Sequence, residues 1–465
     1  MRDRTVNVSY LPTLRPGDSG THGCLAGIKQ SPIPVSVASV ENNMAEMVPH
    51  GGIQASRLSR TLNTGDAIFI GLGSMIGAGI FTALAPAAAA AGAGLVLGLA
   101  IAATVAYFNA SSSAQLARLY PASGGTYVYA GERLNEFWAW VAGWGFVVGK
   151  FASCSAVALT FGYYLIPEYA RYLAAGAVIA FTVLNFFGIQ KTAGATKIIV
   201  SVVLLSLAVI VLLLLVGEPA LSNLRPVLGP NGVYGILQSA GIWFFAFAGY
   251  SRIATLGEEV KDPKTSIPWA IILGLSVTLV VYAAVAISAL LLVGPDLLSR
   301  SDAPLVTALA GAGFGQWQWI VRIGSTFATL GVLLSLMAGI SRMLFAMAAD
   351  HDMPSYLARV HPIHRVPHLS EATVGVILVV VVMLVDLRAA VGFSSFTVLL
   401  YYAVTNLSAY TLTEQERLYG RSLAVPGLLG CLVLAFTLPA TAVGIGSAVM
   451  LAGILVYLIR RRRSP

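Results

Sequence analysis

The sequence predicts an all-α integral membrane protein with about twelve transmembrane helices. Of its 465 residues, 57% are hydrophobic and only 10% are charged, and the mean hydropathy is +0.80. A soluble protein would carry about 25% charged residues. Apolar runs recur almost continuously from about Asp66 onward, and two of them are interrupted near their middle by small residues.

Each transmembrane helix needs about 20 apolar residues, and twelve stretches meet that length. They cover residues 66–91, 93–117, 127–165, 169–188, 191–216, 232–256, 266–293, 319–348, 371–387, 389–412, 422–438 and 440–459. The third and eighth stretches are long enough to tilt or to project beyond the bilayer.

The first 60 residues differ from the rest of the chain. They mix proline, glycine, serine and charges without sustained periodicity, and no apolar segment of a secretory signal follows Arg2 and Arg4. We expect a disordered cytoplasmic tail over residues 1–60. An equally good interpretation is that translation begins at Met44 or Met47.

The net charge of +8 is explained by membrane topology rather than by nucleic acid. Lysine and arginine accumulate on the cytoplasmic side of membrane proteins. With a cytoplasmic N-terminus, the inner side holds Arg57, Arg60, Arg118, Lys191, Lys197, Lys261, Lys264, Arg359, Arg365, Arg417, Arg421 and Arg460 to Arg463. The outer side then holds only Arg171, Arg225, Arg300, Arg322 and Arg388. We therefore expect both termini in the cytoplasm.

Small residues break the first and the sixth predicted helix. The first break is Gly77-Ala78-Gly79, and the second lies in the run Phe244-Phe245-Ala246-Phe247-Ala248-Gly249-Tyr250-Ser251. A spanning helix tolerates a break only where the freed backbone groups face protein, ligand or water. A matching pair of breaks, one in each half of a chain, is typical of the substrate site of a secondary transporter.

The two breaks also organise the chain into repeats. Each opens a block of five helices, and an odd number of helices makes the second block inverted relative to the first. We predict a first repeat over residues 61–225, a second over 226–415, and a final helix pair with a basic cytoplasmic end over 416–465.

The ends of the broken helices predict the chemistry of the ligand. The half-helix that starts near Ile80 presents free N–H groups with partial positive charge, which suits a carboxylate. The half-helix that ends near Phe245 to Phe247 presents free carbonyl groups, which suit an ammonium. A zwitterionic α-amino acid carries both groups. The alternative is that the glycines only let helices pack closely.

At these residues the sequence resembles the amino acid–polyamine–organocation (APC) superfamily of permeases. The resemblance covers about residues 60–460. In the first predicted span it rests on Gly77-Ala78-Gly79-Ile80-Phe81, and after the second on Tyr120-Pro121-Ala122-Ser123-Gly124-Gly125-Thr126-Tyr127-Val128-Tyr129. In and after the sixth span it rests on Phe247-Ala248-Gly249-Tyr250 and on Gly257-Glu258-Glu259-Val260-Lys261-Asp262-Pro263. The last marks are Ser341-Arg342, Met353-Pro354 and His361-Pro362. The run that ends in Asp262-Pro263 is most similar to the branch of cationic amino acid transporters.

The resemblance implies a LeuT-like fold, alternating access, and import or exchange of amino acids driven by protons or by a counter-substrate. It also implies that main-chain groups hold the substrate, with no cofactor and no metal. The residues concerned are Ile76, Gly77, Ala78, Gly79, Ile80, Phe245, Ala246, Phe247, Ala248 and Gly249.

Lys150 is the candidate for energy coupling. Some proton-coupled members of this family carry a lysine deep in the fifth helix, but residues 198–216 contain no basic residue here. Lys150 in the third helix is the only lysine deep in a predicted span, and placing it there costs about 3 kcal/mol on insertion scales. It could act in coupling, make a structural contact, or extend towards an interface. We expect sodium-independent uptake that external acid stimulates.

Other functional classes fit the sequence poorly. An ATP-driven pump needs a phosphate loop, and Gly149-Lys150 does not complete one. Trp144 stands where the loop needs its first glycine, and Phe151 stands where it needs serine or threonine. No histidine lies in a predicted span, which disfavours a Ser–His membrane protease. The chain is therefore not expected to be an enzyme. A non-transporting sensor or a channel remains an alternative.

The substrate expectation rests on the charges in the predicted spans. A cationic substrate would call for an acidic side chain in the cavity, and the first, third, sixth and eighth spans offer none at mid-depth. Neutral amino acids are therefore favoured, with cationic amino acids or polyamines as the alternative.

Overall fold

The computed structural model describes residues 62–120, 124–187, 193–229, 231–254, 256, 259–364 and 366–463. The predictions for the tail over residues 1–60 and for Lys191, Glu258 and Arg365 lie outside these residues. Within them every regular element is a helix, and the only β-type pairing is one isolated bridge between Leu62 and Val260. The predicted all-α membrane class is confirmed.

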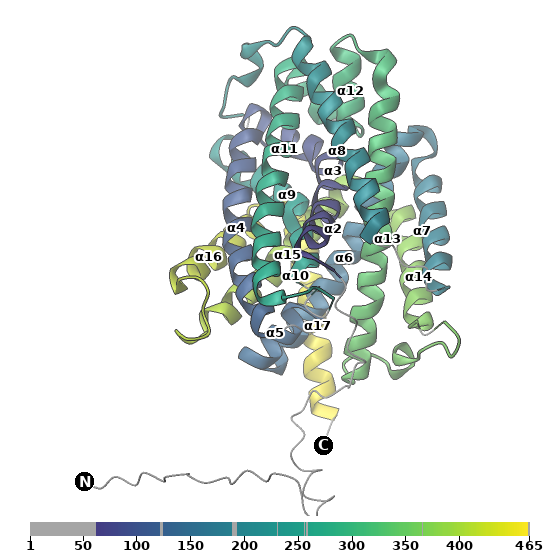
Figure 1. Cartoon of the computed structure of the whole chain (residues 1–465), viewed down its shortest axis with the longest axis vertical. Helices are drawn as coiled ribbons and strands as arrows, with labels where there is room; N and C mark the ends of the chain where they lie inside the picture. Colours follow the sequence, from purple (N-terminus) through teal and green to yellow (C-terminus); the bar gives the residue numbers. More distant parts are fainter. Residues whose placement is uncertain are drawn as a thin grey trace, which may run out of the picture. The chain divides into compact units, whose positions relative to one another are not determined.

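The helices follow the predicted order (Figure 1). The first predicted repeat contains α2 (Thr64–Ile76), α3 (Gly79–Ala91), α4 (Leu95–Leu119), α5 (Thr126–Arg133), α6 (Glu136–Leu165), α7 (Ala170–Phe186) and α8 (Ala193–Val216). The second contains α9 (Gly232–Phe247), α10 (Ser251–Ala254), α11 (Pro263–Arg300), α12 (Pro304–Gly311), α13 (Gln318–Ala349), α14 (His368–Leu384) and α15 (Leu387–Tyr410). The last pair is α16 (Ala424–Phe436) and α17 (Ala440–Arg463).

Among the described residues, nine helical segments are long and apolar enough to cross a membrane, and α14 and α16 lie in two shorter apolar segments. The first long segment, Thr64–Leu119, holds both the first and the second predicted spans. Within the described residues, each of the twelve predicted stretches is therefore largely helical.

The third predicted stretch, 127–165, differs in one respect. It comprises the short helix α5 and the long helix α6, separated at Leu134 and Asn135. The Asn135 side chain accepts a hydrogen bond from the N–H of Trp138 at 3.2 Å, as an N-cap residue does. The cap starts a new helix at Glu136, so only α6 is long enough to span the bilayer.

Burial separates central from peripheral helices. In the most apolar window of α6, 83% of the residues are buried, and this helix packs against α13 and α15. The corresponding windows are 33% buried in α8 and 28% buried in α17. The exposed residues of α8 and α17 are mostly aliphatic, as expected for surfaces that face lipid.

Two of the basic residues counted for the predicted sides make contacts near helix ends. Lys197, of the predicted inner side, pairs with Asp66 at 2.6 Å. Arg322, of the predicted outer side, donates hydrogen bonds to the carbonyl oxygens of Tyr164 and Leu165 at 2.6 and 2.9 Å.

Candidate substrate-binding site

The first break separates α2 from α3. Helix α2 ends at Ile76, α3 begins at Gly79, and Gly77 and Ala78 form a turn between them. No side chain caps the N-terminus of α3. The N–H groups of its first turn have no partner within the helix, and they give this end a partial positive charge.

The second break separates α9 from α10. Helix α9 ends at Phe247, and a short 3₁₀ turn over Ala248–Tyr250 leads into α10. The carbonyl groups of the last turn of α9 give this end a partial negative charge. The carbonyl oxygen of Ala248 accepts a hydrogen bond from the Tyr402 hydroxyl at 3.1 Å, which fixes the turn against α15.

The two breaks contact each other. A Cβ atom built on Gly249 would lie 2.3 Å from the carbonyl oxygen of Ser74 in α2. One built on Gly79 would lie 2.6 Å from the Cβ of Ala246 in α9. No larger residue fits at either position without a backbone shift. The positive end of α3 and the negative end of α9 therefore lie side by side.

Tyr282 of α11 ties both broken helices together. Its hydroxyl lies 2.6 Å from the carbonyl oxygen of Met75 and 3.1 Å from that of Ala246. A hydroxyl has one hydrogen to donate, so the two carbonyl oxygens share a single donor. The sequence held no signal for this residue, because Tyr282 stands in an unbroken apolar run.

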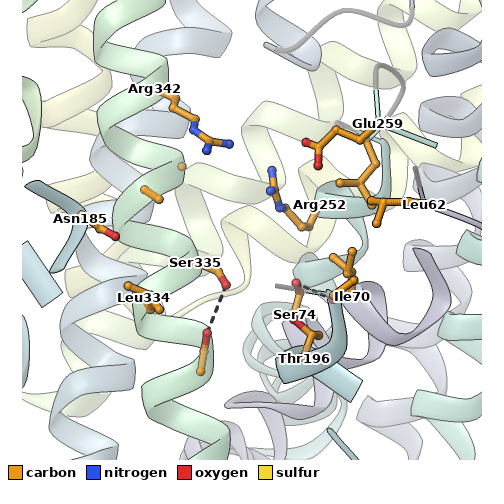
Figure 2. Close-up of a pocket in the computed structure, with 16 residues that line it drawn as sticks. Leu62, Ile70, Ser74, Asn185, Thr196, Arg252, Glu259, Leu334, Ser335 and Arg342 are labelled. Carbon is orange, nitrogen blue, oxygen red and sulfur yellow. Dashed lines mark hydrogen bonds between the residues drawn. The ribbon is translucent and has the colours of Figure 1, made fainter. Parts of the chain in front are cut away.

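The open space lies beside the breaks rather than between them. Of the ten residues predicted to hold substrate, only Phe245 and Gly249 are partly exposed, and the others are buried. A cavity of about 140 Å³ opens between α2, α8, α10 and α13 (Figure 2). Ser74 lines this cavity and also contacts Gly249, so the cavity adjoins the second break.

Polar and charged side chains line much of this cavity. None of the ten predicted substrate contacts is among its lining residues. The polar and charged side chains that line it are Ser74, Asn185, Thr196, Arg252, Glu259, Ser335 and Arg342. Arg342 belongs to the family motif Ser341-Arg342. The place of Arg252 and Arg342 on one cavity wall depends on how α10 and α13 pack.

A second, smaller cavity lies against the first break. It measures about 10 Å³, and Ile76 and Gly77 are among its lining residues. Helix α8 contributes Val200 and Val203 to it. The part of α8 that faces the break is therefore apolar, in agreement with the lack of a basic residue over 198–216.

Lys150 is buried in the central helix α6, with 7% of its surface exposed. Its Nζ lies 5.6 Å from the centre of the Phe146 ring, and the described part of the chain offers it no hydrogen bond or ion pair. This burial argues against the alternative in which the side chain extends to an interface. Lys150 lines neither of the two cavities.

The loop after α10 is paired to the start of α2. The Leu62 N–H donates to the carbonyl oxygen of Glu259 at 3.0 Å, and the Lys261 N–H donates to that of Leu62 at 2.8 Å. These bonds link the two half-helices that flank the larger cavity.

Comparison with known proteins agrees with this architecture. A family model described as amino acid permease matches residues 66–465. The chain belongs to this family. It is therefore an amino acid transporter of the APC superfamily and a multi-pass membrane protein, as its sequence motifs indicated.

Several relatives of this permease are transporters. An uncharacterized transporter of Mycobacterium tuberculosis is 52% identical over 405 residues, which is 87% of this chain and 92% of the relative. The branched-chain amino acid permease of Bacillus subtilis is 26% identical over 87% of this chain and 94% of its own length. The cationic amino acid transporter 7 of Arabidopsis thaliana is 28% identical over 79% of this chain and 68% of its own length.

Proposed function

We propose that this permease is a secondary active transporter that carries neutral amino acids by alternating access. Its substrate is held by main-chain groups of residues 76–80 and 245–249. The contact between the two breaks carries this proposal, because it brings a positive and a negative helix end together. A zwitterion places its carboxylate and its ammonium on the same carbon and so matches both ends.

The choice of a neutral side chain rests on charge. In the described residues of α2, α3, α6, α9, α10 and α13, the acidic residues are confined to the helix ends at Asp66 and Glu136. A cationic side chain would meet no acidic side chain on these helices near the breaks. A relative named as a branched-chain amino acid permease supports this choice, whereas relatives named as cationic amino acid transporters favour the alternative.

We place the protein in the plasma membrane with both termini in the cytoplasm. The excess of basic residues counted for the predicted inner side, which includes Lys197 near the start of α2, supports this orientation. The cavity between α2, α8, α10 and α13 then faces the cytoplasm. Protons or a counter-substrate would drive transport, with Lys150 as the residue that changes protonation.

A substrate panel in proteoliposomes tests this function. Uptake of labelled leucine and alanine is measured alone and in competition with each of the twenty amino acids, ornithine and agmatine. We expect uptake of both labels and stronger competition by neutral amino acids than by arginine. Stronger competition by arginine would reverse the substrate assignment. Absence of uptake for every compound would favour a non-transporting sensor. Uptake that stops when the internal concentration equals the external one would favour a channel.

A further inference from the structure

Two arginines face the same cavity from different helices. Figure 2 shows the guanidinium groups of Arg252 and Arg342 directed into one space, with the carboxylate of Glu259 on the far side of Arg252. Arg252 stands on α10, directly after the second break, and Arg342 stands on α13. Their charges act on each other across the cavity.

The lining of the cavity carries more positive than negative charge, and the carboxylate of Glu371 behind it also acts on Arg342. Among its described lining residues, two guanidinium groups face a single carboxylate, that of Glu259. Arginine does not lose its proton in proteins, so neither positive charge can be removed by titration. Glu371 lies behind the wall, where its carboxylate accepts a hydrogen bond from Ser341 at 2.6 Å, and it does not line the cavity.

Two hydroxyl groups of the cavity wall and the nearest lysine already have partners, so the cationic side chains that line the cavity are those of Arg252 and Arg342. The Ser74 and Ser335 hydroxyl groups already donate to carbonyl oxygens of their own helices, those of Ile70 at 2.9 Å and Gly331 at 3.1 Å. Lys197, near the same end, is paired with Asp66. The cavity of about 140 Å³ is much larger than the roughly 10–15 Å³ that one water needs.

We propose that Arg252 and Arg342 form a carboxylate-binding subsite beside the second break, which the substrate occupies on its way between the breaks and the cytoplasm. Planar guanidinium groups match carboxylates by paired, charge-assisted hydrogen bonds. The same pair repels amino acids with cationic side chains. The subsite rests on the proposed function and adds to it a second site, apart from the breaks, at which neutral amino acids are selected over cationic ones.

Isocaproate, which is leucine without its amino group, is the probe. It keeps the carboxylate and side chain, and it lacks the ammonium that the end of α9 would bind. Direct binding of labelled isocaproate to the purified full chain in sodium-free buffer is measured for the wild type and for Arg342→Gln, Arg342→Lys and Gly79→Leu. Exposed Arg359, outside the cavity, supplies the control Arg359→Gln.

We expect saturable binding by the wild type that weakens about tenfold or more in Arg342→Gln, because a charge-assisted hydrogen bond is lost. Arg342→Lys keeps the positive charge but loses the paired hydrogen bonds, so its affinity should lie between those of the wild type and of Arg342→Gln. Arg359→Gln should bind isocaproate as the wild type does. Since binding is measured without transport, failure of the proposed transport function would not affect the result.

Three results would overturn the subsite. The first is the absence of isocaproate binding by the wild type. The second is equal affinity of Arg342→Gln and wild type. The third is loss of binding in Gly79→Leu with normal binding in Arg342→Gln, which would place the carboxylate at the breaks alone.

Discussion

The hydroxyl group of Tyr282 donates to the carbonyl oxygen of Met75 at 2.6 Å, in the last turn of α2 before the first break. The same hydroxyl lies 3.1 Å from the carbonyl oxygen of Ala246 in α9. The part of α11 that precedes its kink at Gly294 thus contacts both interrupted helices through one side chain. A movement that separates the two interrupted helices would change this shared hydrogen bond.

Tyr282→Phe should therefore impair transport. The substitution leaves two buried carbonyl oxygens without this donor. One lost bond of this kind costs about 1–3 kcal/mol, so we expect the uptake rate to decrease by about five- to 150-fold. Initial rates of leucine uptake, normalised to protein in the membrane, measure the effect. Tyr172, which is 68% exposed, supplies the control Tyr172→Phe. An unchanged rate in Tyr282→Phe would show that the bond has no part in the cycle.

Substitution of the break glycines tests the substrate cradle. Gly79→Leu and Gly249→Leu should reduce uptake to background with near-normal expression and membrane insertion, because each adds bulk where the two helices touch. Gly176 of α7 has no atom within 4 Å of a built Cβ, so Gly176→Leu is the matched control. Wild-type transport by either break variant would mean that the glycines are not part of the substrate site.

Lys150→Met tests the coupling role of the buried lysine. We expect wild-type uptake to rise on external acidification, and the variant to lose this response more than it loses affinity for leucine. Lys264 is exposed at the start of α11, so Lys264→Met controls for the loss of a positive charge. Initial rates are measured with the pH clamped on each side of the membrane. A full pH response in Lys150→Met would remove this residue from the coupling mechanism.

A carboxylate pair at the end of α13 predicts a pH-dependent stability. The Tyr127 hydroxyl lies 2.9 Å from Oδ2 of Asp350 and 3.0 Å from Oδ2 of Asp352, and it can donate to only one of them. Burial raises the pKa of Asp352, and the negative charge of Asp350 raises it further. The hydrogen bond from Tyr127 and the positive charge of Arg460 lower this pKa, but the net shift is upward.

Because the pKa of Asp352 is higher in the folded than in the unfolded protein, the folded protein takes up this proton first as the pH falls. Protonation of Asp352 therefore adds stability as the pH is lowered from neutral towards the unfolded pKa of 3.8. Asp352→Asn should flatten the dependence of Tm on pH between about pH 7 and pH 4. Exposed Asp296 provides the control Asp296→Asn. Parallel curves for Asp352→Asn and wild type would contradict this assignment.

The sequence predicted the features that obey local rules. The twelve apolar stretches follow from the length that a bilayer requires, and the two breaks follow from small residues inside such stretches. The division of the third stretch was missed, although Glu132, Arg133 and Glu136 interrupt the apolar run next to the cap residue Asn135. The long apolar run that follows Glu136 drew the predicted span back across this polar segment.

The site was only partly predictable for a different reason. The break residues could be named because each break is contiguous in sequence. Tyr282 and the pair of Arg252 and Arg342 could not, since their positions depend on which helices pack together. Arg252 and Arg342 are 90 positions apart, and only the arrangement of α10 and α13 directs both side chains into one cavity.

Labelled leucine uptake into sodium-free proteoliposomes, with the external side acidic and the interior alkaline, tests the central claim most directly. The account predicts that leucine accumulates inside above its external concentration, and that a protonophore returns it to equilibrium. Leucine that never exceeds equilibrium, or that accumulates only when sodium is added, would contradict a sodium-independent, proton-driven carrier.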